Sequence, residues 1–149
     1  MLTYRCKAFN ELNLLQLYAI MALRQEVFVV EQNCPYLDAD GKDLAAHHLV
    51  GYDDNGNTVA YARLLPKGVS YEHHASMGRI VTKPSVRGRG LGKELMKNAL
   101  DWADRLYPNE SIKISAQTYL RKFYEDFGFV VSGEEYLEDG IPHLPMVRG

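Results

Sequence analysis

The stretch RGRGLG at residues 87–92 constrains this chain more than any other, because it must turn the backbone and then open a helix. Glycine reaches positive φ values that other residues avoid, so a glycine-rich turn can point its amides at an anion. A helix starting there adds free N–H groups and the positive end of its dipole. The arginines at 87 and 89 and Lys93 supply countercharge. The stretch therefore predicts a loop that binds a diphosphate.

The length, net charge and cysteine content of the chain argue against several classes of protein. With 149 residues, the sequence predicts one domain spanning residues 1–149. A net charge of −2 argues against a general nucleic-acid binder, which needs a basic face. No run approaches the length of a membrane span, and without a basic, apolar leader pattern at its start we expect no secretory signal. Cys6 and Cys34 are too few for a disulfide framework, so we expect a cytoplasmic protein.

The pattern of apolar residues predicts a mixed α/β sheet with few, short helices. A strong hairpin signal, Asp54-Asn55-Gly56, joins two of the strands. Pro142 and Pro145 would confine the last strand to an edge or give it a bulge. The expected strands are 2–9, 47–52, 58–65, 77–82, 111–117, 129–136 and 141–147, and the expected helices are 13–30, 90–106 and 119–127, with an ordered loop over 31–46.

Three kinds of phosphate loop compete for residues 87–92. A P-loop needs Ser or Thr after its Gly-Lys pair, but Glu94 stands there. A dinucleotide-binding loop needs Gly-x-Gly-x-x-Gly, and no register here supplies its third glycine. The pattern Arg/Gln-x-x-Gly-x-Gly/Ala fits at Arg87, Gly90 and Gly92.

That third pattern resembles the pyrophosphate loop of the GNAT family of N-acetyltransferases. The segment GRIVT at 78–82 precedes it, as the central strand of that family does. The motif FYxxxGF at 123–129 is similar to the second signature of the family. Segments 23–32, 40–43 and 140–143 look like an ElaA-like branch. The fitted order of elements covers nearly the whole chain.

The resemblance implies a mostly antiparallel central sheet, splayed between its middle strands and flanked by helices. It implies an acetyl-CoA-dependent N-acetyltransferase whose acceptor, a primary amine of a small molecule or peptide, attacks the thioester directly. Gln117 stands where the family often has Asn, which leaves the local geometry open. The implied cofactor-binding residues are Ile80, Val81, Thr82, Arg87, Gly88, Arg89, Gly90, Leu91, Gly92, Lys93, Gln117 and Tyr124.

Acyl transfer to an amine also needs an acid and a base. Tyr124 is the candidate acid, because an ordinary phenol is protonated at neutral pH and can give its proton to a leaving thiolate. Glu31 and His48 are the leading candidates for the base, with Glu72 and His143 behind them. Each has a structural alternative: Glu31 can pair with Arg24, and a lone strand histidine is usually satisfied by its neighbours.

The acceptor pocket is expected near Glu31, Tyr36 and the loop of residues 38–43. The acidic residues of that loop would favour a cationic acceptor, although an acidic surface turn would have the same composition. Arg24 and Arg79 lie in apolar runs, so each is expected to have a buried partner such as Glu26, Glu31 or Asp43. His73-His74 lacks a third ligand, so no metal site is expected.

Two other functions stay open. An acyl-homoserine-lactone synthase would share the architecture but uses an acyl carrier protein and does not depend on the loop at 87–92. A non-catalytic CoA-binding regulatory module would keep the loop and lose the acid, yet Tyr124 is present. The sequence also leaves a homodimer open.

Overall fold

The computed structural model describes residues 2–149 and contains one mixed sheet of eight strands. The sheet order is β1-β2-β3-β4-β5-β8-β6, with β7 also paired to β8. All neighbours are antiparallel except β4 and β5. The strands are β1 (Thr3–Ala8), β2 (His47–Tyr52), β3 (Thr58–Leu65), β4 (Ala75–Thr82), β5 (Ile112–Gln117), β6 (Val130–Val131), β7 (Tyr136–Glu138) and β8 (Ile141–Arg148).

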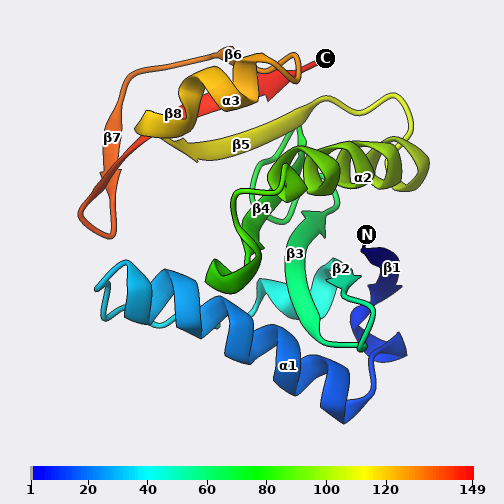
Figure 1. Cartoon of the computed structure of the whole chain (residues 1–149). Coiled ribbons are helices and arrows are strands. Elements are labelled where there is room, and N and C mark those ends of the chain that lie inside the picture. The colour runs from blue at the N-terminus through cyan, green and yellow to red at the C-terminus, as the bar shows by residue number, and fades with distance from the viewer. Residues whose placement is uncertain (1) are drawn as a thin grey trace.

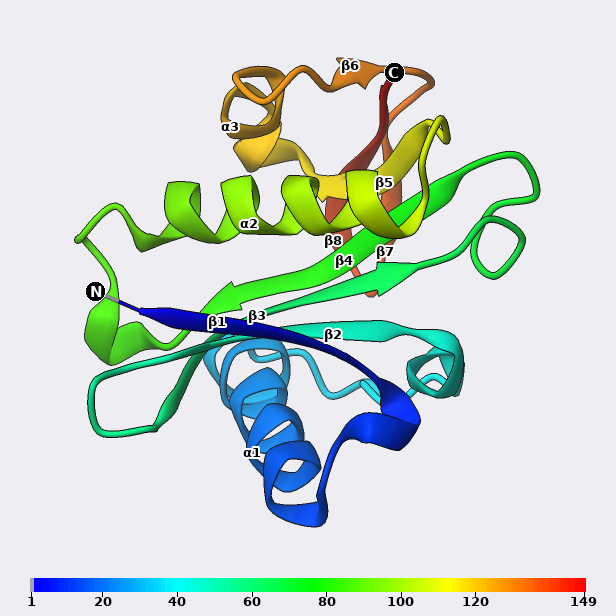
Figure 2. The same cartoon turned by 90° about the vertical axis from the view of Figure 1, so that its right-hand side faces the viewer.

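Helices cover both faces of this sheet, with α1 on one face and α2 on the other (Figures 1 and 2). None of the helices within residues 2–149 is long and apolar enough to cross a membrane. The α-helices are α1 (Leu14–Arg24), α2 (Leu91–Leu106) and α3 (Arg121–Glu125). A π-helical segment, η2 (Gln25–Glu31), continues α1, and the 3₁₀ turns are η1 (Phe9–Glu11), η3 (Lys42–Ala45), η4 (Pro84–Val86) and η5 (Thr118–Leu120).

Strand β3 lies in the middle of two hydrophobic clusters, and its residues 59–65 are all buried. Alternate side chains of a strand point to opposite faces, so Ala60 and Ala62 join the cluster under α2. Tyr61 joins the smaller cluster under α1, where it meets Ile20 and Leu23. A strand that is apolar on both faces can only sit inside a sheet covered from both sides.

Strands β4 and β5 separate soon after they meet. They are parallel, and only Ala75 with Ile112 and Ser76 with Lys113 are paired. Beyond these two pairs β5 has no strand partner on the side of β4, while on its other side it pairs with β8 along its whole length. The predicted α/β fold, with its mostly antiparallel sheet splayed in the middle, is thus confirmed.

The amino-terminal helix begins as the sequence predicts but does not stay regular. Asn13 caps it: its side chain accepts from the Gln16 amide at 2.8 Å, and the Gln16 side chain accepts from the Asn13 amide at 3.0 Å. From Gln25 the turns widen into η2, a conversion often found at functional sites. The widened turns direct Phe28 and Glu31 to the cavity described below.

The carboxyl-terminal strands differ from the prediction. The strand expected over 129–136 is instead two short strands, β6 and β7, because Gly133 packs tightly on the ring of Pro145; a Cβ added there would lie 2.9 Å from Pro145 Cγ. β8 is also not an edge strand, since it pairs with β5 on one side. Pro145 is accommodated because the partner strand on the other side is interrupted there, whereas Pro142 is opposite Leu137 of β7 and precedes the residues that pair with β5.

Candidate functional site

A cavity of about 630 Å³ is lined by residues of both β4 and β5, the two strands that separate. Ser76 to Thr82 supply one wall, and Ile114, Ser115 and Gln117 supply part of the other. Tyr124 of α3, the π-helical segment η2, the loop around residues 34–42 and the β7–β8 turn complete the lining. The cavity is therefore a direct consequence of the incomplete pairing of β4 with β5.

The glycine loop leads from β4 into α2 with the conformation that its sequence predicts. Gly88 and Gly90 have φ values of 85° and 73°, and nothing lies within 4 Å of a Cβ added to either one. Backbone conformation, not packing, therefore requires glycine at both positions. No side chain caps α2 at Gly90, and the first amide bonded to the Gly90 carbonyl is that of Glu94, at 3.3 Å. The amides of the first helical turn are thus directed out of the helix end.

The predicted cofactor residues fall into two groups. One group lines the cavity and consists of Ile80, Val81, Thr82, Arg87, Gln117 and Tyr124. The other forms the turn and the first helical residues beside it, outside the cavity lining, and consists of Gly88, Arg89, Gly90, Leu91, Gly92 and Lys93. Arg87 connects the two groups, because it belongs to the loop and lines the cavity.

Strand β4 bulges at the centre of the cavity wall. Tyr61 is opposite Val81 and Arg63 is opposite Gly78, so β4 has one more residue than β3 between these pairs. Arg79, one of the two residues in the bulge, has a φ of 50°. A non-glycine residue with positive φ inside a strand is a strained conformation of the kind that collects at functional sites.

Tyr124 is buried yet contributes to the cavity lining. Its ring packs edge-on against Phe123 and Phe129, with ring centroids 5.3 and 6.0 Å away. Burial, with Tyr119 nearby, raises the pKa of Tyr124 to about 12. The phenol therefore keeps its proton across the physiological pH range.

Glu31 lines the cavity but is held by Arg87. Both carboxylate oxygens accept from the Arg87 guanidinium, each at 2.7 Å. These bonds lower the pKa of Glu31, which makes it a weaker base than a free carboxylate. The sequence offered Arg24 as the partner of Glu31, and the structure gives it Arg87 instead.

His48 does not reach the cavity. It is fully buried, its Nε2 lies 2.9 Å from the Asp43 carbonyl oxygen, and its Nδ1 lies 2.6 Å from the Tyr61 hydroxyl. Burial lowers its pKa. With both ring nitrogens bonded inside the protein, the geometry gives His48 a packing role and not that of the base. Glu72 is also outside the cavity lining and exposed, whereas His143 lines the cavity.

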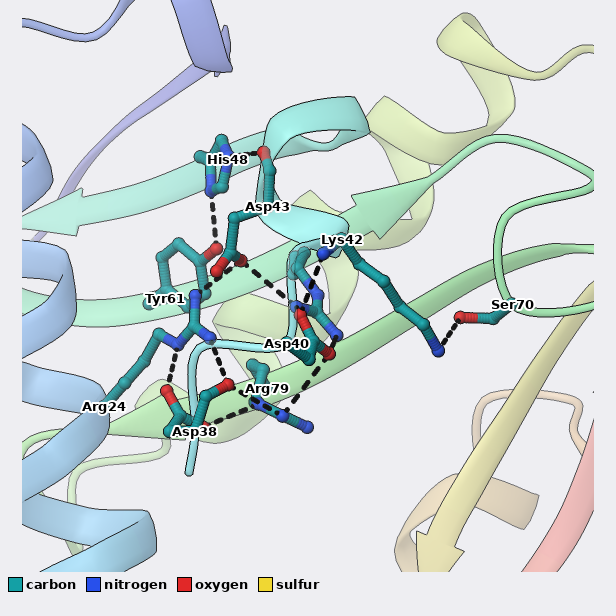
Figure 3. Close-up of polar contacts among 10 residues, drawn as sticks. Arg24, Asp38, Asp40, Lys42, Asp43, His48, Tyr61, Ser70 and Arg79 are labelled. Atoms are coloured by element: carbon teal, nitrogen blue, oxygen red, sulfur yellow. Dashed lines mark hydrogen bonds and ion pairs between the residues drawn. The ribbon is translucent and has the colours of Figure 1, made fainter. Parts of the chain in front are cut away.

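Three arginines and three aspartates form a cluster, most of whose members line the cavity (Figure 3). Arg24 donates to Asp38 and to Asp43, at 2.7 Å each, and its side chain is 0% exposed. The other ion pairs of this ionic cluster are Arg63 with Asp40 and Asp43, and Arg79 with Asp38 and Asp40. Arg24, Arg63 and Asp43 are buried, whereas Arg79 and Asp40 are partly exposed. Burial alone would lower the pKa of Arg24, but Asp43 and Asp38 raise it.

These pairs occupy the aspartates on which the expectation of a cationic acceptor was based. Asp38, Asp40 and Asp43 do lie next to the cavity or in its lining, but each is already neutralised by arginines. The buried partner expected for Arg24 is confirmed in kind, since Asp43 is one of its two partners. Lys42 lines the cavity as well, and its ammonium donates to the Ser70 hydroxyl at 3.0 Å.

Several cavity residues were not singled out from the sequence. Arg63 is one, although it stands in the same kind of apolar run as Arg24, and that signal could have identified it. Others had no local signal, because they meet only through the fold: Tyr71, Ser115 and Glu138. Within residues 2–149, no three His, Cys, Asp or Glu side chains are grouped in a way that could hold a metal ion.

Comparisons with known proteins agree with this geometry. The family model described as Acetyltransferase (GNAT) domain matches residues 25–148. Protein ElaA of Escherichia coli is 43% identical over 141 residues, which cover 93% of this chain and 91% of that protein. A UPF0039 protein of Schizosaccharomyces pombe is 40% identical and covers 94% of this chain and 92% of its own length. Neither name specifies a substrate.

Solved structures give the same result. An acyl-CoA N-acyltransferase from Pseudomonas aeruginosa is 45% identical with a TM-score of 0.93, and Escherichia coli ElaA is 38% identical with a TM-score of 0.93. Each comparison covers 100% of both chains. With a family match over most of its length and relatives this similar, the chain belongs to the GNAT family of acyl-CoA N-acyltransferases.

Proposed function

We propose that this protein is an acetyl-CoA-dependent N-acetyltransferase that acts on a primary amine of a small molecule or peptide by direct attack. One observation carries the proposal: Arg87 lines the cavity between β4 and β5 and is also the first residue of the glycine loop that leads to the uncapped amino terminus of α2. GNAT enzymes use acetyl-CoA as co-substrate and need a second substrate as acyl acceptor.

The chain has suitable groups for each part of this co-substrate. The turn at Gly88 and Gly90 and the free amides of α2 suit a diphosphate, with Arg87, Arg89 and Lys93 as countercharge. A slender amide-bearing arm suits the gap between β4 and β5, whose facing backbone groups are left without strand partners beyond Ser76 and Lys113. The bound thioester supplies the acetyl group.

The bulge in β4 supports the chemical step. A bulge takes local amides out of the ladder and re-aims them, and Ile80 and Val81 lie in the cavity wall at this point. An amide directed at the thioester carbonyl would stabilise the negative charge that develops during attack, by about 3 kcal/mol for one well-placed donor. Tyr124, protonated and in the same cavity, would then give its proton to the leaving sulfur.

Calorimetry with coenzyme A, followed by thiol release from acetyl-CoA with a panel of primary amines, tests the proposal. We expect binding heat, thermal stabilisation and amine-dependent thiol release. Binding without any release would favour the regulatory module. Activity with acyl carrier protein and none with CoA would favour the homoserine-lactone synthase. Absence of any heat or stabilisation would refute the CoA site.

Tyr124→Phe tests the acid within this scheme. The variant keeps the ring and its aromatic contacts, so we expect nearly unchanged affinity for acetyl-CoA and a kcat lower by at least about 100-fold. Phe123→Leu is the control, because it alters the same aromatic cluster without removing a hydroxyl. A large loss of affinity in Tyr124→Phe would make the residue structural.

A further inference from the structure

His143 lines the cavity with one ring nitrogen free to accept a proton. Its side chain is only 8% exposed, and its Nδ1 lies 2.7 Å from the Ile141 carbonyl oxygen. A carbonyl can only accept, so Nδ1 must carry a hydrogen and donate it. In the neutral ring the lone pair is then on Nε2. His48 differs, because both of its nitrogens have partners within the protein core.

The carboxylate of Glu138 faces this free nitrogen. Glu138 Oε2 lies 3.5 Å from His143 Nε2, and its other oxygen accepts from the Ser115 hydroxyl at 3.1 Å. A carboxylate oxygen and an imidazole lone pair are both acceptors, so they cannot bond to each other. A group with several N–H donors, such as a primary ammonium, can donate to both at once.

The surrounding elements fix this pair in place. Tyr136 of β7 stacks on the His143 ring, with centroids 6.1 Å apart, and its hydroxyl contacts Ser115 of β5. His143 is also opposite Gln117 in the pairing of β8 with β5, and both residues line the cavity with Tyr124. The pair is therefore held by β5, β7 and β8 in the same cavity as the candidate acid.

We propose that His143 is the general base of the acetyl transfer and that Glu138 holds the acceptor ammonium beside it; this inference rests on the proposed function. His143 Nε2 takes one proton from the ammonium and later releases it to solvent. The neutral nitrogen forms its bond to the acetyl carbon, and the carbon–sulfur bond breaks. Tyr124 protonates the sulfur, and the proton remaining on nitrogen returns to the phenolate through water.

The other charged and titratable groups around the pair come from three elements. Tyr136 is on β7 with Glu138, and Tyr71 lies in the loop between β3 and β4, close enough for Glu138 and Tyr136 to raise its pKa further after burial has done so. Lys113 of β5 lies over the Tyr71 ring, 4.8 Å from its centroid. Burial raises the pKa of both tyrosines, so they keep their protons at neutral pH and do not compete with His143 for the proton of the acceptor.

The variant His143→Asn separates catalysis from structure. The Asn side-chain amide can still donate to the Ile141 carbonyl as Nδ1–H does, while Nε2 is lost. Thiol release is measured with ethylamine, which is protonated at pH 7, and with 2,2,2-trifluoroethylamine, which is similar in size but largely neutral. We expect kcat/KM for ethylamine to fall by about 100-fold and that for trifluoroethylamine to change only a few-fold.

Two further measurements sharpen the result. In His143→Asn only the neutral amine can react, so kcat/KM for ethylamine should fall about tenfold for each pH unit between pH 9 and 7. In the wild type, where the enzyme itself deprotonates the ammonium, the fall should be much shallower. Glu138→Gln should mainly raise KM for ethylamine, because it removes the charge that attracts the ammonium. His73→Asn and Glu135→Gln, both at exposed positions, are the matched controls.

The outcomes distinguish this inference from the proposed function. Equal losses with both amines, or the same pH dependence of kcat/KM for ethylamine in His143→Asn and the wild type, would overturn the role of His143. Unchanged KM in Glu138→Gln would overturn that of Glu138. If the wild type releases thiol and any of these results is obtained, the inference fails alone. If the wild type binds coenzyme A but releases no thiol with either amine, the proposed transfer fails together with the inference. If the wild type does not bind coenzyme A, both fail.

Discussion

The glycine loop and the ionic cluster contribute to the candidate site in opposite ways. The turn of the loop makes few internal contacts: Gly88 and Gly90 are exposed and are needed for their backbone conformation. The cluster makes many internal contacts: Arg24 is fully buried, and each residue of the cluster forms ion pairs with other members. Such a loop is suited to binding a ligand, whereas the cluster can stabilise the shape of the cavity lining.

This difference predicts whether a mutation should affect ligand binding or folding stability. A change in the loop should affect ligand binding with modest cost to folding, because little of the native packing depends on it. A change in the cluster should affect folding first, since removing one partner leaves an uncompensated charge in the interior.

The largest effect is expected from Arg24→Met, which tests the cluster. The substitution leaves Asp38 and Asp43 partly unpaired, and we expect the free energy of unfolding to fall by about 3 kcal/mol or more in urea titrations. Arg121→Met is the control, because its pair with Glu125 is exposed and contributes less than about 1 kcal/mol. Equal losses in the two variants would remove the contrast between cluster and surface.

Gly90→Glu tests the loop side of the comparison. The side chain brings strain at a φ of 73° and a negative charge where a diphosphate would bind, so coenzyme A should no longer raise the melting temperature. Gly56→Glu is the matched control, with a φ of 81° and equally open surroundings in the hairpin turn. If both variants respond to coenzyme A as the wild type does, the loop is not part of the binding site.

Acid unfolding tests how much the ion pairs of the cluster contribute to stability. Burial would raise the pKa of Asp40, but bonds from Arg63, with Lys42 and Arg79 nearby, lower it from 3.8 to about 2. A lowered pKa stabilises the fold above the unfolded value, and this stability is lost as the pH falls from about 4 to 2. Asp40→Asn should therefore be less stable by about 1 kcal/mol at pH 7, after allowing for solvent screening.

The comparison that checks this is wild type against Asp40→Asn in urea across pH 2 to 7. Their difference should be constant at neutral pH and vanish toward pH 2. A difference that persists at the lowest pH would assign the effect to packing and not to ionisation.

The smallest effect is expected from Glu31→Gln, at the boundary between loop and cavity. The variant releases Arg87 from its bidentate partner, so affinity for coenzyme A should rise a few-fold, and more at low salt, with little change in stability. Calorimetry at two salt concentrations measures this. If thiol release collapses while affinity is unchanged, Glu31 is the base and His143 is not.

The sequence predicted best those features that are set locally. The strands at 47–52 and 58–65 were predicted to the residue, because Asp54-Asn55-Gly56 marks the turn between alternating apolar runs. The helix after the glycine loop was predicted within one residue of its start at Leu91. The splay between β4 and β5 came from the family resemblance and is confirmed.

Features that depend on contacts between residues far apart in the sequence could not be predicted. The interruption between β6 and β7 follows from the ring of Pro145 pressing on Gly133, which periodicity does not encode. The aspartates at 38–43 look like an acidic surface until Arg63 and Arg79 come in from other strands. His48 looked available for chemistry until the fold enclosed it against Tyr61. The assignment of residues 1–149 to one domain, and the roles of the site residues, stay predictions.

The unfinished pairing of β4 with β5 has one more consequence, for solubility. Unpaired strand edges normally invite other chains to add on and start aggregation. Here the two open edges face each other inside the sheet, and the pairs at Ala75 and Ser76 close one end of the opening. A strand of another molecule would have to enter between them. The protein can therefore leave these backbone groups unpaired for a slender ligand without exposing an open strand edge to other molecules.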